Sequence, residues 1–300
     1  TEGGAPAGPS CLADYPTLGV DDDALYIGAN QFCGFGVNAL AFDSTSVYVL
    51  PKASLVAGTL AVAAFDGVLP GPTSDGGYTP QGVDNFDGDT SAGFVIGVDN
   101  AGFGSLVMHR ISNPGAAPAI SGAISVAVPS TGLPIDVPHP GGTLPLDGLD
   151  DRLLQAVIRA GRLWTTQQIQ VNGSGAADNN GGRNAVRWYE IGSLDSTPAL
   201  VQSGTVFDGA AASPVSYWMG GIMANGQGHA ALGMSVAGAG SHVNTAFTGR
   251  LASDPPGVMD PPSQYSANSS FSYNQQSAPA TMQRWGDYSY TSVDPDDDMT

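Results

Sequence analysis

Lysine and glutamate are almost absent from this chain, and long apolar runs are absent altogether. Lys52 is the only lysine, and Glu2 and Glu190 are the only glutamates, so nearly all of the acidic residues are aspartates. Because lysine and glutamate favour helices whereas aspartate favours turns, this imbalance argues against a helical protein. No run of about 18 apolar residues is present, so we expect no segment that inserts into a membrane.

Basic residues are also scarce. Nine Lys and Arg stand against 27 Asp and Glu, which gives a formal net charge of −18. Nucleic acids and anionic membranes bind to basic surfaces, so we expect neither as a partner. What the chain does contain is 42 Gly, 22 Pro and 42% hydrophobic residues. This composition is typical of many short strands joined by turns.

The chain has only two cysteines, Cys11 and Cys33, and the segment between them reads as a strand, an Asp-rich turn and a second strand. If the turn is centred on Asp22, each cysteine lies eleven residues from its centre. The two would then oppose each other across an antiparallel pair, within reach of a disulfide. The alternative is two buried free thiols. A disulfide indicates an oxidising compartment, so we expect a secreted, extracellular or cell-surface protein.

A repeated unit runs along the chain. Five similar segments start near residues 15, 82, 149, 217 and 285, so successive starts lie 67 or 68 residues apart. Each unit holds about four strand-like runs, which is the content of one propeller blade. We therefore predict an all-β fold, a β-propeller with four-stranded blades of about 67 residues that forms one domain over residues 1–300. A β-sandwich and a β-solenoid are the alternatives.

Three segments give more local expectations. Residues 153–171 predict a β-hairpin that turns at Gly161, and the polar, Pro-rich residues 254–283 predict a long surface loop. Both ends of the chain fall inside a repeat, so we expect an incomplete ring in this chain. Either further sequence completes the ring, or the open blade edges pair with another copy and produce self-association.

The strings RWGDYS and VRWYEI, with DYPTLGVDDDALYIGANQF and LDDRLLQAVIRAGRLWTT, resemble a group of poorly characterised secreted bacterial proteins. The resemblance covers most of the chain and implies a sialidase-like β-propeller for which no activity is agreed. Members of the group usually carry Arg-Trp-Met-Gly-Ser. This chain instead has Tyr217-Trp218-Met219-Gly220-Gly221, without that arginine.

Sialidase chemistry requires a cluster of arginines that binds a carboxylate, a Tyr–Glu pair and an acidic Asp. Arg187, Arg250 and Arg284 are candidates for the cluster, because Arg binds carboxylates through a bidentate fork. The alternative for these arginines is pairing with Asp between blades.

The other members of a sialidase site fit less well. Tyr189 and Glu190 are neighbours on one expected strand, so they point to opposite faces. Asp287, which follows the flexible Gly286, is the best single polar candidate. The candidate catalytic residues are therefore Asp287, Arg284, Glu190 and Arg187.

Calcium is the cofactor that the sequence predicts. Asp84, Asp87 and Asp89 gather oxygen ligands around Gly88, a residue that permits a tight turn. Ca²⁺ binds six to eight oxygen atoms, so these three residues form a candidate metal site. The same pattern is typical of Asx turns that bind no metal, and this alternative stays open.

Two classes of function are compatible with these features. The first is a binding or structural module whose partner is a glycan or an extracellular protein. The second is a carbohydrate-active enzyme, either a sialidase-like glycoside hydrolase or a polysaccharide lyase. We favour the first class, because the sequence does not assemble a complete set of catalytic residues.

Overall fold

The computed structural model of this chain describes residues 11–34, 41–69, 77–88, 92–99, 101–264 and 269–298. These residues form two compact units. The first consists of residues 1–84, 88–102 and 106–125, and the second of residues 85–87, 103–105 and 126–300. The single helix in the described ranges, α1 (Lys52–Val56), is one turn long, and no described helix could cross a bilayer.

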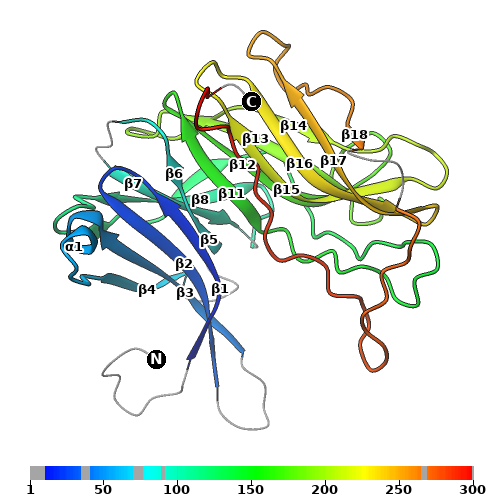
Figure 1. The fold of residues 1–300 in the computed structure, drawn as a ribbon, viewed down its shortest axis with the longest axis horizontal. Helices are drawn as coiled ribbons and strands as arrows, with labels where there is room; N and C mark the ends of the chain where they lie inside the picture. The colour runs from blue at the N-terminus through cyan, green and yellow to red at the C-terminus, as the bar shows by residue number, and fades with distance from the viewer. Residues whose placement is uncertain are drawn as a thin grey trace. The chain divides into compact units, whose positions relative to one another are not determined.

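The strands form four antiparallel sheets, two of which lie mainly in the first unit. The first sheet has the order β1-β2-β3-β4, and Figure 1 shows its four strands side by side. Its strands are β1 (Cys11–Val20), β2 (Ala24–Cys33), β3 (Ala41–Pro51) and β4 (Ala63–Leu69). The second sheet has the order β10-β8-β7-β5, with β9 paired to β8. Its strands are β5 (Tyr78–Gly82), β7 (Ala92–Val98), β8 (Ser105–Ser112), β9 (Ala119–Ile120) and β10 (Ile124–Ala127).

The third and fourth sheets lie mainly in the second unit. The third sheet has the order β14-β13-β12-β11-β6, and the fourth has the order β15-β16-β17-β18. The strands of the third sheet are β6 (Asp84–Asn85), β11 (Leu153–Arg159), β12 (Arg162–Val171), β13 (Arg183–Gly192) and β14 (Ala199–Val206). Those of the fourth are β15 (Val215–Ala224), β16 (Ala230–Gly238), β17 (Ser241–Arg250) and β18 (Ser263–Gln264).

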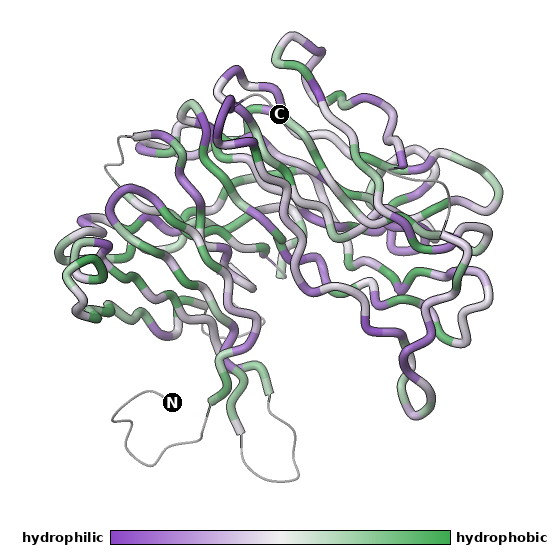
Figure 2. The backbone as a smooth tube through the Cα atoms, viewed as in Figure 1, coloured by the Kyte–Doolittle hydropathy of each residue, from purple (hydrophilic) through white to green (hydrophobic). Residues whose placement is uncertain are grey.

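Each sheet is built around an antiparallel meander in which chain neighbours are also sheet neighbours. A four-stranded meander of this kind is the structure of a propeller blade. Many of the connecting loops are hydrophilic, whereas many residues within the strands are hydrophobic (Figure 2). The predicted fold class, all-β with four-stranded propeller blades, is confirmed.

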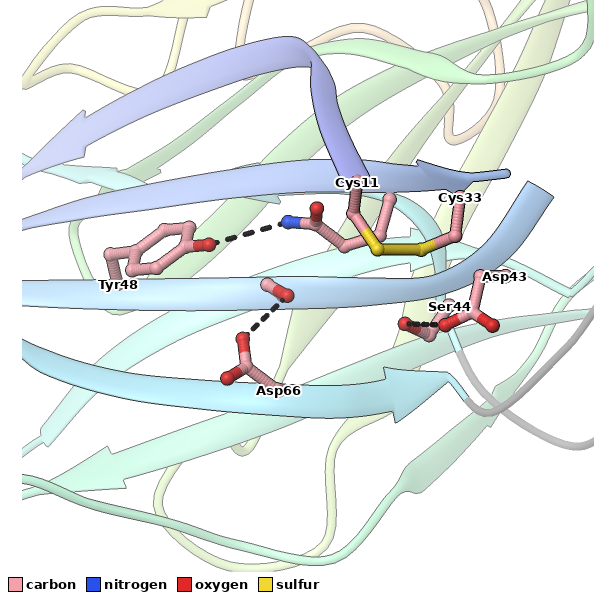
Figure 3. The surroundings of a disulfide bond; sticks show 8 residues. Cys11, Cys33, Asp43, Ser44, Tyr48 and Asp66 are labelled. Carbon is pink, nitrogen blue, oxygen red and sulfur yellow. Dashed lines mark hydrogen bonds between the residues drawn. A yellow bond between two sulfur atoms is a disulfide. The ribbon is translucent and has the colours of Figure 1, made fainter. Parts of the chain in front are cut away.

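The predicted disulfide is confirmed, although the turn that led to it is not centred where we expected. Cys11 and Cys33 oppose each other at the far end of the β1–β2 hairpin and are bonded, with a Cα–Cα distance of 4.1 Å (Figure 3). Near the turn, Val20 opposes Leu25, which centres the turn between Asp22 and Asp23. A bulge after Asp14 adds one residue to β1 and restores the register at the cysteines.

The hairpin expected at residues 153–171 is also confirmed. β11 and β12 pair from Arg159 and Arg162 outward, and Ala160 and Gly161 form the turn with positive φ angles of 52° and 68°. Both faces of β12 are buried almost throughout. One face carries Trp164, whose ring stacks on that of Trp188 at 6.0 Å between centroids. This pair belongs to the large apolar core that the third and fourth sheets share.

The C-terminal segment, residues 284–298, differs from the expectation of a further strand pair. It forms no strand and instead lies against the third and fourth sheets of its own unit. Thr291 exchanges two hydrogen bonds with the Gln155 side chain, and its hydroxyl donates to the carbonyl of Gly221 at 2.7 Å. Asp298 pairs with Arg159 and accepts the N–H of Gly226. Hydrogen bonds and an ion pair that involve side chains therefore attach this segment, whereas a strand would be attached by backbone-to-backbone hydrogen bonds.

Residues 254–283 contain one two-residue strand, β18, in their described part. Gln283 anchors the end of this region. Its backbone pairs with Pro145 and Asp147, and its buried side-chain oxygen accepts the N–H groups of Gln275 and Gln276. The region is thus irregular but attached at its C-terminal end.

Removing the disulfide should destabilise the protein. The cross-link spans 22 residues, and closing a loop of this length in the unfolded chain stabilises the native state by about 3 kcal/mol. We expect the double variant Cys11→Ser/Cys33→Ser to lose about this much unfolding free energy in a denaturant titration. Reduced wild-type protein is the control and should match the variant. Equal stability of oxidised wild type and variant would contradict the expectation.

Candidate functional site

The four candidate catalytic residues lie in the second unit, and the structure separates them into different environments. Arg284 and Asp287 pair with each other at 2.6 Å in the C-terminal segment, and both side chains are about half exposed. Arg284 also lies 3.5 Å from the carboxylate of Asp147. Of the three arginines considered for a carboxylate-binding cluster, Arg284 is therefore the one that pairs with aspartates.

Glu190 and Arg187 lie on opposite faces of β13. Trp164 opposes Glu190 on β12, whereas Gln167 opposes Arg187, and these two β12 residues point to opposite sides. The Glu190 carboxylate accepts a hydrogen bond from Gln202 at 2.6 Å and lies 3.6 Å from Arg162.

Tyr189 shares the face of Arg187 and not that of Glu190. Its hydroxyl donates to Gln167 at 2.7 Å, on the side of the sheet away from the Glu190 carboxylate. The Tyr–Glu pair of a sialidase therefore does not form at these two positions.

Arg187 belongs to a buried polar cluster that the sequence analysis did not identify. Tyr189 donates to the side-chain oxygen of Gln167, and the Gln167 amide donates to Asp151 at 2.9 Å. The guanidinium of Arg187 donates to the hydroxyl of Thr205 at 2.6 Å. We call Asp151, Gln167, Arg187 and Tyr189 the Asp151 cluster.

Two charged atoms of the Asp151 cluster have no hydrogen-bond partner among the described residues. They are Oδ1 of Asp151 and Nη1 of Arg187, and both are buried. A buried polar atom without a partner carries a desolvation cost, which makes such atoms unusual in a native fold. The third sheet therefore presents one acceptor and one donor whose bonding capacity the protein does not fill.

Burial changes the acidity of the cluster. It raises the pKa of Asp151 to about 7, and the neighbouring negative charge of Asp150 adds to the increase. The hydrogen bond from Gln167 and the charge of Arg152 act in the opposite direction but are weaker. Burial likewise raises the pKa of Tyr189, against the opposing charge of Arg187. At neutral pH the cluster thus contains an acid near half-protonation, a neutral phenol and a cation. Such a set can donate a proton or bind a polar ligand.

The pair Asp150-Asp151 is visible in the sequence, but it was interpreted only as the start of a repeat. Asp150 and Asp151 precede β11, and only their burial distinguishes them. Asp150 binds Arg152 at 2.6 Å, while Asp151 is fully buried. The two neighbouring aspartates differ in burial because the chain turns into β11 between them. The string LDDR alone does not show this turn.

The predicted metal ligands have separate roles in the described structure. In the first unit, Asp84 accepts the N–H of Val20 at 3.0 Å, and burial raises its pKa to about 6. In the second unit, Asp87 accepts the N–H groups of Ala160 and Gly161 at 2.8 and 2.6 Å. Asp89 lies outside the described residues. No group of three metal-binding side chains is found within the described ranges, and the calcium site stays a prediction.

An open cavity of about 310 Å³ lies at one end of the fourth sheet. It is formed by the ends of β15 and β17, the start of β16, the residues after β17 and the C-terminal segment. The lining residues are Met223, Asn225, His229, Ala230, Ala231, Gly249, Arg250, Leu251, Asp260, Ser292 and Val293. None of the four candidate catalytic residues lines it.

Arg250 lines this cavity, and its guanidinium makes hydrogen bonds to the backbone. It donates to the carbonyls of Val258 and Asp254 at 3.2 and 3.0 Å and lies 5.6 Å from the ring centroid of Trp188. Arg250 and Arg187 thus bind neutral oxygens, in contrast to the interblade Asp pairing that the sequence left open.

These features define the class of the molecule as an all-β protein of propeller blades with a buried polar cluster and a separate surface cavity. No family model and no curated protein matches the chain. Three solved structures are similar in fold. A GH43_12 protein retrieved from the capybara gut metagenome is 11% identical, with 88% of this chain and 45% of that chain covered and a TM-score of 0.42.

The neuraminidase-like protein of subtype N11, from a flat-faced bat isolate of Peru, is 12% identical, with 86% and 56% covered and a TM-score of 0.40. The xylan β-1,4-xylosidase of Bacillus halodurans C-125 is 14% identical, with 85% and 43% covered and a TM-score of 0.35. This chain spans about half the length of the structures it matches. The resemblance to secreted bacterial proteins with RWGDYS and RWYEI strings stays a prediction.

The acidity of Asp151 leads to a test of the cluster. The folded state holds the Asp151 proton up to about pH 7, whereas an unfolded Asp releases it near its ordinary pKa of 3.8. This residue therefore favours the fold below pH 4 and loses that contribution as pH rises to 7, by about 1.4 kcal/mol for each unit of pKa difference. We expect Asp151→Asn to remove this dependence.

The measurement is the melting temperature from pH 4 to pH 8 for wild type, Asp151→Asn and the exposed control Asp195→Asn. The gain of Asp151→Asn over wild type should grow with pH, while the control should follow wild type. A gain that is constant or falls with pH would show that Asp151 is ionised throughout.

Proposed function

We propose that this chain is a secreted or cell-surface β-propeller module that binds a glycan or another extracellular partner. The observation that carries the proposal is the separation of the four candidate catalytic residues. Arg284 and Asp287 pair in an exposed position, and Arg187 and Glu190 occupy opposite faces of β13. A hydrolytic site needs its acid and its base or nucleophile around one substrate, so this separation favours binding over turnover.

The location outside the cytoplasm is supported by the Cys11–Cys33 disulfide. Structural disulfides persist in oxidising compartments and are rare where thiols are kept reduced. The net charge of −18 supports an uncharged or cationic partner in preference to an anionic polymer. Both features fit a module that meets polysaccharide or protein outside the cell.

A carbohydrate-active enzyme is the second candidate, and the Asp151 cluster favours it. A carboxyl group with a pKa of about 7 has the acidity required of a general acid at neutral pH, and Arg187 lies in the same cluster. A glycoside hydrolase requires a second carboxylate across the substrate. The described part of the cluster contributes none, which is why this candidate ranks second.

Binding and turnover can be separated in one set of experiments. The chain is applied to glycan arrays and to insoluble polysaccharides, and the same polysaccharides are assayed for new reducing ends and for the unsaturated uronates that a lyase releases. Retention without turnover supports the proposal. Turnover that Asp151→Asn abolishes would establish the enzyme instead.

Asp287 offers a sharper test of the two classes. Its exposed pair with Arg284 should contribute about 1 kcal/mol or less, so we expect Asp287→Asn to change the melting temperature little. If the chain is a binding module, retention on the preferred glycan should also stay unchanged. Loss of a measurable polysaccharide turnover in this variant, with the fold intact, would assign Asp287 to a catalytic site.

Calcium and self-association remain part of the proposal. If Asp84, Asp87 and Asp89 bind Ca²⁺, the ion should raise the melting temperature, because a ligand that binds only the folded state stabilises it. Addition of Ca²⁺ to chelator-treated protein should then shift the melting temperature, and Asp87→Asn should abolish the shift. An unchanged melting temperature would leave Asp87 with its role at the β11–β12 turn.

Sedimentation velocity over a range of concentrations tests pairing through open blade edges.

A further inference from the structure

We propose that the 310 Å³ cavity at the end of the fourth sheet binds one neutral, hydroxylated sugar ring. This inference names the ligand class and the residues of the binding function proposed above, and it rests on that function. We call the site the Asp260 pocket. It lies entirely within the second unit and uses none of the residues of the Asp151 cluster.

Three regions of sequence bring polar groups to the Asp260 pocket. His229 lies in the turn that joins β15 to β16, where its backbone N–H donates to the Asn225 side chain at 3.0 Å. Asp260 is held beside β17, because its backbone N–H donates to Gly249 and its carbonyl accepts from Thr248. Ser292 comes from the C-terminal segment, one residue after the anchoring Thr291. The polar groups of the pocket are therefore fixed by backbone contacts on three sides.

The hydrogen bonds of His229 determine which of its nitrogens can meet a ligand. The backbone N–H of Ala252 donates to Nδ1 at 2.9 Å. Nδ1 is then the acceptor of a neutral imidazole, and the proton resides on Nε2. Nε2 consequently acts as a donor, suited to the oxygen of a hydroxyl group.

The same bond excludes a serine-hydrolase triad in this pocket, although Ser292, His229 and Asp260 all line it. In a triad, Nδ1 donates to the carboxylate and Nε2 accepts the serine proton. Here Nδ1 already accepts a backbone N–H, so both roles are reversed. The three residues therefore do not form a Ser–His–Asp triad.

The charges of the pocket favour a neutral ligand. Arg250 contributes one positive charge to the lining; two of its nitrogens donate to carbonyl groups, and its guanidinium lies near the ring of Trp188. Asp260 contributes one negative charge at the rim, and no described residue donates to its carboxylate. The two charges offset each other, so the pocket attracts neither a cation nor an anion strongly. The free acceptor is nevertheless suited to hydroxyl donors.

Apart from Asn225, the remaining lining is apolar. Met223, Ala230, Leu251 and Val293 offer hydrocarbon surface against which the C–H face of a ring can pack. A volume of 310 Å³ lies at the lower limit of small-molecule sites, which are about 300–1,000 Å³. One sugar ring fits this space, and the rest of a glycan would extend outward through the open side. Because the lining holds no Trp, Tyr or Phe ring on which a sugar could stack, we expect affinity in the millimolar range.

The test is an NMR titration of the full chain with five neutral sugars, glucose, galactose, mannose, xylose and arabinose, and with two charged ones, glucuronate and glucosamine. At least one neutral sugar should bind, and the charged ones should bind more weakly than the neutral sugar of the same configuration. Asp260→Asn keeps the size of the side chain and should weaken binding about tenfold, because a charged acceptor becomes a neutral one. Asp195→Asn, an exposed substitution outside the pocket, should bind as wild type does.

His229→Gln supplies a second variant, since its amide still donates, and it should weaken binding less than His229→Ala. Melting temperatures show whether each variant is folded. Binding of glucuronate or glucosamine above every neutral sugar, unchanged affinity in Asp260→Asn, or no binding of any sugar would each overturn the Asp260 pocket.

Glycan arrays with wild type and Asp260→Asn distinguish this failure from failure of the function. If both proteins bind the array equally, the glycan-binding function stands and the site lies elsewhere. If neither binds the array and no neutral sugar binds in the titration, the glycan form of the function fails together with the pocket.

Discussion

Hydrogen bonds from neutral side chains to the backbone of a neighbouring sheet hold each unit together. In the first unit, the hydroxyl of Thr17 donates to the carbonyl of Pro80 and accepts the N–H groups of Gly28 and Gly82. In the second, the hydroxyl of Thr166 donates to Gly220 at 2.6 Å. Sheets that pack face to face usually meet through apolar side chains alone. Here a few hydroxyl and amide groups also fix the position of one sheet against the next.

The scarcity of charged residues is consistent with this arrangement. Gln168 is buried, and its side chain accepts the N–H of Met219 while donating to the carbonyls of Gly148 and Asp150. A charged side chain at this position would need a partner of opposite sign to offset its desolvation. An amide satisfies donors and acceptors together and needs none. Arg250 departs from this pattern, because this buried charge is paired with carbonyl oxygens and an aromatic ring and not with a carboxylate.

Local patterns predicted the strands well, whereas tertiary contacts decided the site. The hairpin over residues 153–171 follows from β-forming residues on both sides of Gly161, and the disulfide follows from the symmetry of one turn. The two cysteines oppose each other only because the bulge after Asp14 compensates for a turn whose centre is displaced toward Asp23. Whether a segment forms a strand depends mainly on the residues within that segment, so strands can be predicted from the sequence.

The environments of Asp151, Glu190 and Asp260 depend on residues of other strands, which the short windows that predict a strand do not contain. Gln167 contacts Asp151 from the next strand, and Gly249 holds Asp260 from the end of β17. The C-terminal segment was expected to contain strands because a copy of the repeat starts near residue 285. It is instead attached by Thr291, whose contact with Gln155 crosses more than a hundred residues of sequence. Predictions from sequence patterns were therefore least informative for segments that are attached by polar side chains and not by the backbone hydrogen bonds of a sheet.

The position of the disulfide also determines how the chain transmits mechanical force. Cys11 is the first residue of β1, and Cys33 is the last residue of β2. Tension applied to the chain before Cys11 passes through the sulfur atoms directly to Cys33, so β1 cannot be peeled from β2 one hydrogen bond at a time. The load enters the sheet at Cys33 instead, which opposes Ala41, the first residue of β3. The covalent bond thus shields the pairing of β1 with β2 from tension that is applied before Cys11.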